Sequence, residues 1–255
     1  MMDNSLVPKK LKVLIMKKSI LALIILATGS QAFANEKQAE KVNYGDPTAS
    51  YSMLGGAVNE NKVQLNTMVG LGEHIFVGDL GYSTDKDTPS DKKLDYRARY
   101  FNVTDGLGFS VDVLGNTDKT TALGGMVYKF EVNPQLMVFP MASFGHQWIH
   151  DGTDKNTRKG INADSNLAQL GIYTMYAFEG GHWLYANPKS TYIVEGEQFL
   201  NQVEVGGGYM VADAASVGFK IEYTDEIKGT AKNGIGTDSK IESDTVFWLN
   251  AAMYF

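Results

Sequence analysis

The chain has 255 residues, of which 44% are hydrophobic, with 27 glycines, no cysteine and a formal net charge of −6 at neutral pH. Its length suits a single domain. The lack of cysteine excludes disulfides and thiolate metal sites, and the acidic balance argues against a nucleic-acid partner, because nucleic-acid binding needs a basic face.

The start of the chain has the three parts of a secretory signal sequence. Met16-Lys17-Lys18 is a short basic start, residues 20–27 are an apolar run, and Ala32-Phe33-Ala34 is a small-x-small cleavage site. A helix over residues 20–27 would span about 12 Å, whereas a bilayer core is about 30 Å thick, so the run is too short to anchor the chain. We predict that residues 1–34 are a signal peptide, with Met16 as an alternative start.

Removal of this peptide makes the chain more acidic. Five of the 23 basic residues and one of the 29 acidic residues lie before residue 35, which leaves 18 against 28 and a net charge of −10. We predict that residues 35–49 form an N-terminal segment on the periplasmic side, ahead of strands that begin near residue 50.

From residue 50 onward the chain repeats a segment of about ten residues in which hydrophobic and polar side chains alternate, followed by a polar break. In residues 93–101, for example, large apolar side chains alternate with Asp95, Arg97 and Arg99. Pro188 interrupts the weakest segment, and losing that segment with a neighbour would leave ten strands. Twelve strands are predicted: 50–58, 62–70, 74–83, 93–101, 107–115, 120–130, 135–149, 166–178, 183–194, 198–211, 215–224 and 244–255.

The gaps between these strands alternate in length. The long, charged gaps are 83–92, 150–165 and 225–243, and all three are odd-numbered gaps in chain order. The even-numbered gaps are short turns. In an up-and-down antiparallel sheet this parity places the long loops at one end and the turns at the other.

The last strand presents a hydrophobic face at period two that includes Phe247, Met253 and the terminal Phe255. A strand that ends on phenylalanine resembles the assembly signal of bacterial outer-membrane β-barrel proteins, although Asn250 stands where that signal usually has glycine. The chain as a whole resembles that class in its porin-like form. The resemblance implies an all-β fold, with residues 50–255 forming one antiparallel transmembrane barrel of about twelve strands.

The same resemblance implies a cellular location and partners. The protein would be exported through the periplasm into the outer membrane, where it would contact lipid and lipopolysaccharide after folding with the barrel-assembly machinery. The oligomeric state stays open, and neither a metal nor a cofactor is expected. Aromatic girdles are predicted at the two membrane interfaces. Trp183, Tyr209, Tyr254 and Phe255 fall near turns or the terminus, and Tyr82 and Trp148 fall near the external loops.

Polar positions opposite the hydrophobic face should point into the lumen, where acids and bases occur in similar number. We expect Arg97 and Arg99 to pair with Asp112, and Lys220 to pair with Glu204. Such pairs either brace a closed barrel or form the transverse field of a pore constriction. The candidate pore-lining residues are Asp95, Arg97, Arg99, Asp112, Lys129, Glu204, Lys220 and Glu222.

Three functions are compatible with these features. The leading hypothesis is a small porin-like channel for ions or small polar solutes. The alternative is a structural or adhesive surface barrel with a closed lumen that acts through its external loops. A barrel hydrolase is disfavoured. Outer-membrane phospholipases and lipid A deacylases resemble one another in having a His-x-Ser pattern near the barrel rim, and no histidine of this chain occurs in that pattern. We therefore expect no enzyme activity.

Overall fold

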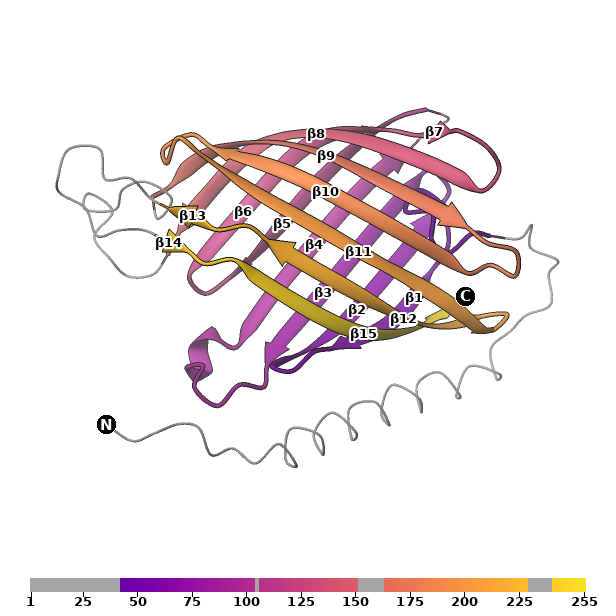
Figure 1. Cartoon of the computed structure of the whole chain (residues 1–255), viewed down its shortest axis with the longest axis horizontal. Coiled ribbons are helices and arrows are strands. Elements are labelled where there is room, and N and C mark those ends of the chain that lie inside the picture. The colour runs from indigo at the N-terminus through magenta and orange to yellow at the C-terminus, as the bar shows by residue number, and fades with distance from the viewer. Residues whose placement is uncertain (1–41, 104–105, 151–162, 229–239) are drawn as a thin grey trace.

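The computed structural model describes residues 42–103, 106–150, 163–228 and 240–255, so the predicted signal peptide and residues 35–41 lie outside the described part. Nearly all of the described chain forms antiparallel strands (Figure 1). The strands are β1 (Met53–Val58), β2 (Lys62–Leu71), β3 (His74–Ser83), β4 (Leu94–Val103), β5 (Leu107–Asn116), β6 (Lys119–Tyr128), β7 (Phe130–Glu131), β8 (Leu136–Ile149), β9 (Ser165–Ala177), β10 (Trp183–Ile193), β11 (Gln198–Ala212), β12 (Ala215–Thr224), β13 (Ile227–Lys228), β14 (Lys240–Ile241) and β15 (Asp244–Tyr254).

Twelve long strands close into a barrel. Each pairs with the long strands before and after it along the chain, β6 with β8 included, and the pairing of β1 with β15 closes the ring. β7 continues β6 along the edge of β8, while β13 and β14 form a separate two-stranded ribbon. Closure satisfies the backbone groups that an open sheet edge would expose to lipid. The prediction of a single antiparallel twelve-stranded barrel is confirmed.

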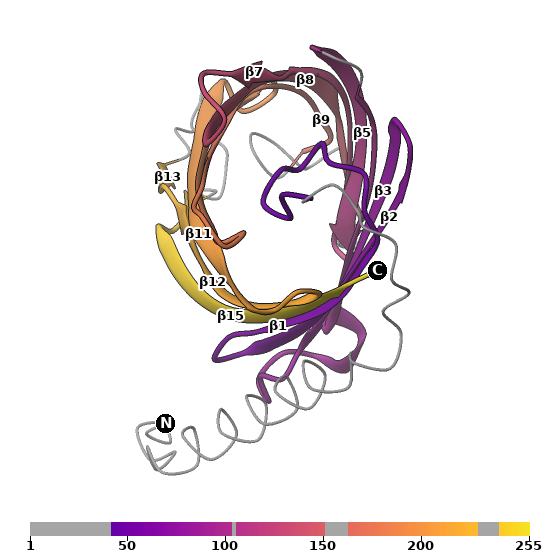
Figure 2. The same cartoon turned by 90° about the vertical axis from the view of Figure 1, so that its right-hand side faces the viewer.

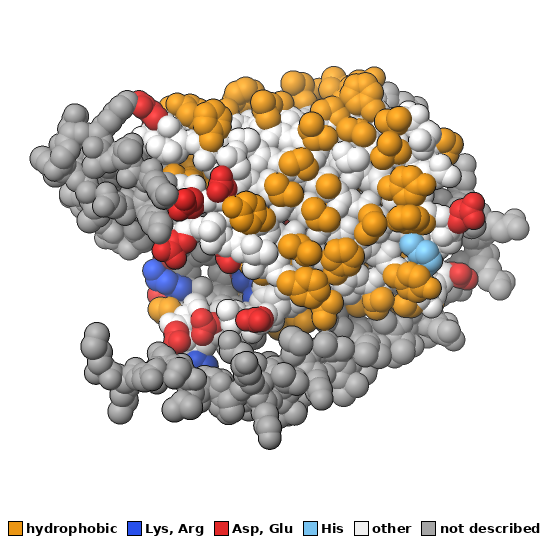
Figure 3. Space-filling view, viewed as in Figure 1, with side chains coloured by type: hydrophobic (Ala, Val, Ile, Leu, Met, Phe, Trp, Pro, Cys, Tyr) orange, Lys and Arg blue, Asp and Glu red, His pale blue; other side chains and the backbone are white. Residues whose placement is uncertain are grey.

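The wall has an apolar outer face and a polar inner one because side chains alternate along each strand. Large apolar side chains remain exposed on the outside, among them Phe144 and Leu170, which are 71% and 68% exposed. Figure 3 shows hydrophobic side chains spread over the visible face of the barrel, with acidic side chains toward its two ends and most of them on the left. Exposed apolar area on this scale is typical of a surface that contacts lipid.

The two ends of the barrel differ as the gap lengths predict. We call one the turn end, where short connections join β2 to β3 and β11 to β12 and where Phe255 lies. At the other, the loop end, residues 84–93 with the short helix η2 (Ser90–Lys92) join β3 to β4. The other two long gaps also join strands at the loop end, but residues 151–162 and 229–239 lie outside the described residues.

The strand that contains Pro188 forms in full. β10 pairs with β9 and β11, although its pairing with β9 skips Asn187 and Pro188. Pro188 lacks an N–H to donate, and it lies on the outer face, where its ring displaces no inner side chain. The flanking residues keep the ladder in register, so the ten-strand alternative is wrong.

Two of the six predicted girdle residues face inward instead. Trp183 lies over Gly208 of the adjacent strand on the inner face, and Tyr254 is buried beside the segment that precedes β1. Both are near the turn end, as predicted, but the alternation along their strands points them into the barrel. The other four, Tyr82, Trp148, Tyr209 and Phe255, are exposed.

Within the part of the chain that the structure describes, no helix is long and apolar enough to cross a membrane.

Candidate functional site in the lumen

The inner face surrounds a cavity of about 320 Å³. Strand register places every candidate lining residue that lies within a strand on this face, and four of them, Arg97, Arg99, Asp112 and Glu204, line the cavity directly. Asp95, Lys129, Lys220 and Glu222 lie elsewhere along the inner wall. The other polar and aromatic residues that line the cavity include Ser110, Ser143, Gln169, Tyr173, Tyr185, Asn187 and Lys189.

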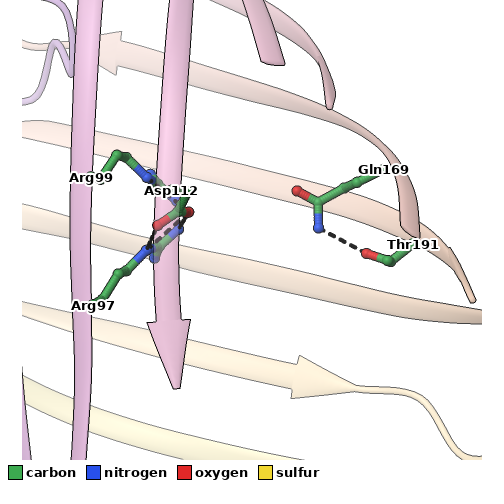
Figure 4. A network of polar contacts seen from close by, with 5 residues as sticks. All are labelled: Arg97, Arg99, Asp112, Gln169 and Thr191. Atoms are coloured by element: carbon green, nitrogen blue, oxygen red, sulfur yellow. Dashed lines mark hydrogen bonds and ion pairs between the residues drawn. The ribbon is translucent and has the colours of Figure 1, made fainter. Parts of the chain in front are cut away.

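Two arginines of β4 converge on one carboxylate of β5 (Figure 4). Arg97 donates to both oxygens of Asp112, with its Nη2 2.6 Å from Oδ2, and Arg99 donates to the same Oδ2 from 2.5 Å. This is the pairing that the sequence predicts. Because one carboxylate serves two guanidinium groups, the cluster carries an excess of one positive charge and is held rigidly by charge-assisted hydrogen bonds.

The opposite wall, formed by β9, β10 and β11, holds a second polar group. Gln169 donates to Thr191 at 2.8 Å, as Figure 4 also shows, and Tyr185 donates to Glu204 at 2.7 Å. Lys189 lies on the same wall, lines the same cavity as Arg97 and Glu204, and forms no ion pair with a described residue. The cavity therefore has fixed charges of both signs on facing walls.

Lys189 and Asn187 are among the lining residues that the sequence did not predict. Both lie on β10 at the inward positions that follow Tyr185 at period two. Pro188 between them obscured the alternation, which was the available signal. Asn187 has a buried side-chain oxygen for which the described residues provide no hydrogen-bond partner.

The predicted pair of Lys220 with Glu204 does not form. Lys220 binds Glu222, two residues along the same strand, at 2.8 Å, and Glu222 also accepts a hydrogen bond from the indole of Trp248 at 2.7 Å. The Lys220 ammonium lies 5.1 Å from the centre of the Trp248 ring. The ammonium therefore prefers a carboxylate and an aromatic face nearby to a carboxylate on the next strand, where Tyr185 already holds Glu204.

The two remaining candidates lie near the ends of the barrel. Asp95 binds Lys62 at 2.7 Å near the loop end. Lys129, at the turn end, binds Asp46 at 2.8 Å and Glu131 at 3.3 Å. Asp46 belongs to the chain ahead of β1, so this pair joins the wall to a segment inside the barrel.

Residues 43–52, which we call the inserted segment, curl inside the ring of strands at the turn end (Figure 2). The hydroxyl of Tyr173 donates to the carbonyl of Gly45 at 3.0 Å. Ser52 exchanges two backbone hydrogen bonds with Phe255, which fixes the point where the segment joins the wall. The sequence predicts a segment ahead of the barrel but gives no sign that it enters the lumen.

Aromatic packing holds the same segment against the last strand. Tyr44 stacks on Tyr254 with 3.8 Å between ring centres, and the Tyr51 hydroxyl donates to the carbonyl of Tyr44 at 2.7 Å. Burial raises the pKa of Tyr44, with the charge of Asp213 adding to the effect. Burial likewise raises the pKa of Tyr51, so both phenols stay protonated and able to donate at neutral pH.

The described residues contain no group of three or more His, Asp or Glu side chains that could hold a metal ion. The predicted assembly signal lies at the turn end: Met253 pairs with Leu54 of β1 and Ala215 of β12, and the Phe255 ring projects outward.

No family model and no curated protein sequence matches this chain. Solved structures do match it. The NanC porin superposes with a TM-score of 0.57 at 8% identity, over 79% of this chain and 98% of the porin. The KdgM porin, in a structure with disordered oligogalacturonate, superposes with a TM-score of 0.51 at 7% identity, over 80% of this chain and 99% of the porin. An outer membrane channel from Pseudomonas putida F1 superposes with a TM-score of 0.49 at 11% identity, over 84% of this chain and 100% of the channel. At these identities the likeness is one of fold, and this chain has the fold of the small outer-membrane porins.

Proposed function

We propose that the protein is a small outer-membrane channel for ions and small polar solutes. The observation that carries this proposal is a closed wall, apolar outside, around a cavity of about 320 Å³ with charges of both signs on facing walls. That volume equals the share of about ten water molecules in liquid water. A cavity of this size and polarity suits hydrated ions and solutes no larger than a simple sugar.

A structural or adhesive barrel is the second candidate, and the bracing of the lumen favours it. Arg97 and Arg99 lock onto Asp112 across β4 and β5, and the inserted segment occupies part of the turn end. If these features close the lumen completely, the function lies in the loop end. A hydrolase receives no support, and the solved structures that share the fold include porins, so we keep the expectation that the protein is not an enzyme.

Single-channel recording in planar bilayers separates the two candidates. The full chain would be exported by a bacterial host, purified from its outer membrane and checked for folding by heat-shifted gel mobility. Recovery of the protein in the outer-membrane fraction tests its location in the cell. Discrete current steps are expected, and their reversal potential in a salt gradient gives the ion preference. Folded protein that produces no steps under any voltage would remove the channel proposal in favour of the surface barrel.

A further inference from the structure

The inserted segment is packed into the lumen as tightly as an interior element. Gly45 faces Trp183 and Met175 so closely that a Cβ there would overlap both side chains. Asp46 is 4% exposed, and its carboxylate is divided between Lys129 and its own backbone turn at Thr48. A loosely attached N-terminal arm would leave its polar groups in water, so this packing indicates that the segment has a defined position inside the barrel.

The contacts of the segment come from widely separated parts of the wall. Tyr173 reaches it from β9, Lys129 from the junction of β6 with β7, and Tyr254 from β15. In the strand order β6 and β15 lie on opposite sides of the ring, whereas β9 is separated from β6 only by β8. The segment is therefore held across the mouth at the turn end and does not lie flat along one strand.

The segment is also part of the boundary of the lumen cavity. A solute that enters the cavity from the loop end meets the segment before it reaches the turn end. The segment residues that line the cavity are Tyr44, Gly45, Pro47, Thr48 and Tyr51.

From these contacts we infer that the inserted segment is the constriction that determines the conductance and the solute size limit of the channel. This inference rests on the proposed function and deepens it. Its key link is the ion pair of Lys129 with Asp46, because removing one partner leaves a buried, unpaired charge that favours release of the segment. If the segment were released into the periplasm, the opening at the turn end would widen to the full diameter of a twelve-stranded barrel.

Two variants test the inference by current recording and by exclusion of polyethylene glycols of increasing size. Lys129→Met removes the partner of Asp46. The pair Asp46→Cys with Lys129→Cys removes the ion pair and supplies the chain's first two thiols, which a short, reducible bifunctional thiol reagent can join. Lys62→Met is the matched control, since it removes an ion pair with Asp95 near the opposite mouth.

We expect wild type, Lys62→Met and the cross-linked cysteine pair to share one small conductance and one size limit. Lys129→Met and the reduced cysteine pair should conduct at least about twofold more and admit larger polymers, because the lumen of a barrel this wide holds water where side chains do not fill it. If Lys129→Met fails to fold, the comparison of cross-linked with reduced cysteine protein carries the test alone.

The remaining outcomes separate the two proposals. Equal conductance and equal size limits in all five proteins would overturn the constriction and leave the channel intact. Folded protein that is silent in every form would overturn the channel itself, and the constriction with it. A silent wild type with a conducting reduced pair would remove the channel proposal for the native protein and would overturn the constriction as well, because the segment would then close the lumen completely.

Discussion

Trp183 of β10 lies directly over Gly208 of β11, its register partner on the inner face of the barrel. A methyl group at position 208 would overlap the indole, which is held from the other side by the inserted segment at Gly45. We expect Gly208→Ala to lower the free energy of unfolding by about 1–3 kcal/mol, as overpacking does. Urea unfolding in detergent micelles, followed by tryptophan fluorescence and gel mobility, measures the loss.

Gly124→Ala on β6 is the matched control for that substitution. A Cβ at Gly124 meets nothing within 4 Å, so the change adds a methyl group to a strand without a steric cost. Its free energy of unfolding should stay within about 0.5 kcal/mol of wild type. Equal losses at positions 124 and 208 would show that backbone freedom, and not the contact with Trp183, is what the glycine contributes.

The convergence of Arg97 and Arg99 on Asp112 predicts an asymmetry among substitutions. Asp112→Asn leaves two neighbouring guanidinium groups without a counter-charge and should destabilise the barrel by about 1–3 kcal/mol. Arg99→Met leaves the bidentate pair of Arg97 with Asp112 intact and should cost less. The same unfolding measurement orders the two variants, and a larger loss for Arg99→Met would contradict the account of Asp112 as the shared anchor.

Most of the wall was predictable from the sequence because period-two alternation is a local property of each strand. Residues 93–101 show it clearly, and the inner face of β4 follows with Asp95, Arg97 and Arg99 in place. The parity of the long gaps also follows from the chain alone. Both signals arise from one physical requirement, an apolar exterior against lipid and a closed ladder of backbone hydrogen bonds.

The errors arose where local pattern does not decide the direction of a side chain. Trp183 and Tyr254 were placed in girdles from their nearness to turns, which is the same for inward and outward residues. Pro188 broke the alternation that would have corrected Trp183 and revealed Lys189. The inserted segment has no periodicity, and its contact between Gly45 and Tyr173 joins positions 128 apart, so no sequence window contains it.

Lys189 is expected to influence the preference of the channel for anions over cations. It lines the cavity and forms no ion pair with a described residue, so its charge should contribute to the field that a passing ion meets. Lys189→Met should shift the reversal potential in a salt gradient toward cations, and Lys189→Arg should keep the wild-type value because the charge stays in place. If both variants behave alike, the shift reflects the shape of the cavity, and the electrostatic role assigned to Lys189 is wrong.

Phe255 is expected to act on assembly and not on the stability of the finished barrel. Its ring projects outward and is 72% exposed, while the backbone bonds to Ser52 do not depend on the side chain. Phe255→Ala should therefore lower the amount of protein recovered from the outer membrane several-fold, with little change in the unfolding of the fraction that assembles. Phe247→Ala removes another exposed ring, from β15, and is the control. Comparable recovery of the two variants would mean that the ring at position 255 serves lipid contact alone and is not read during assembly.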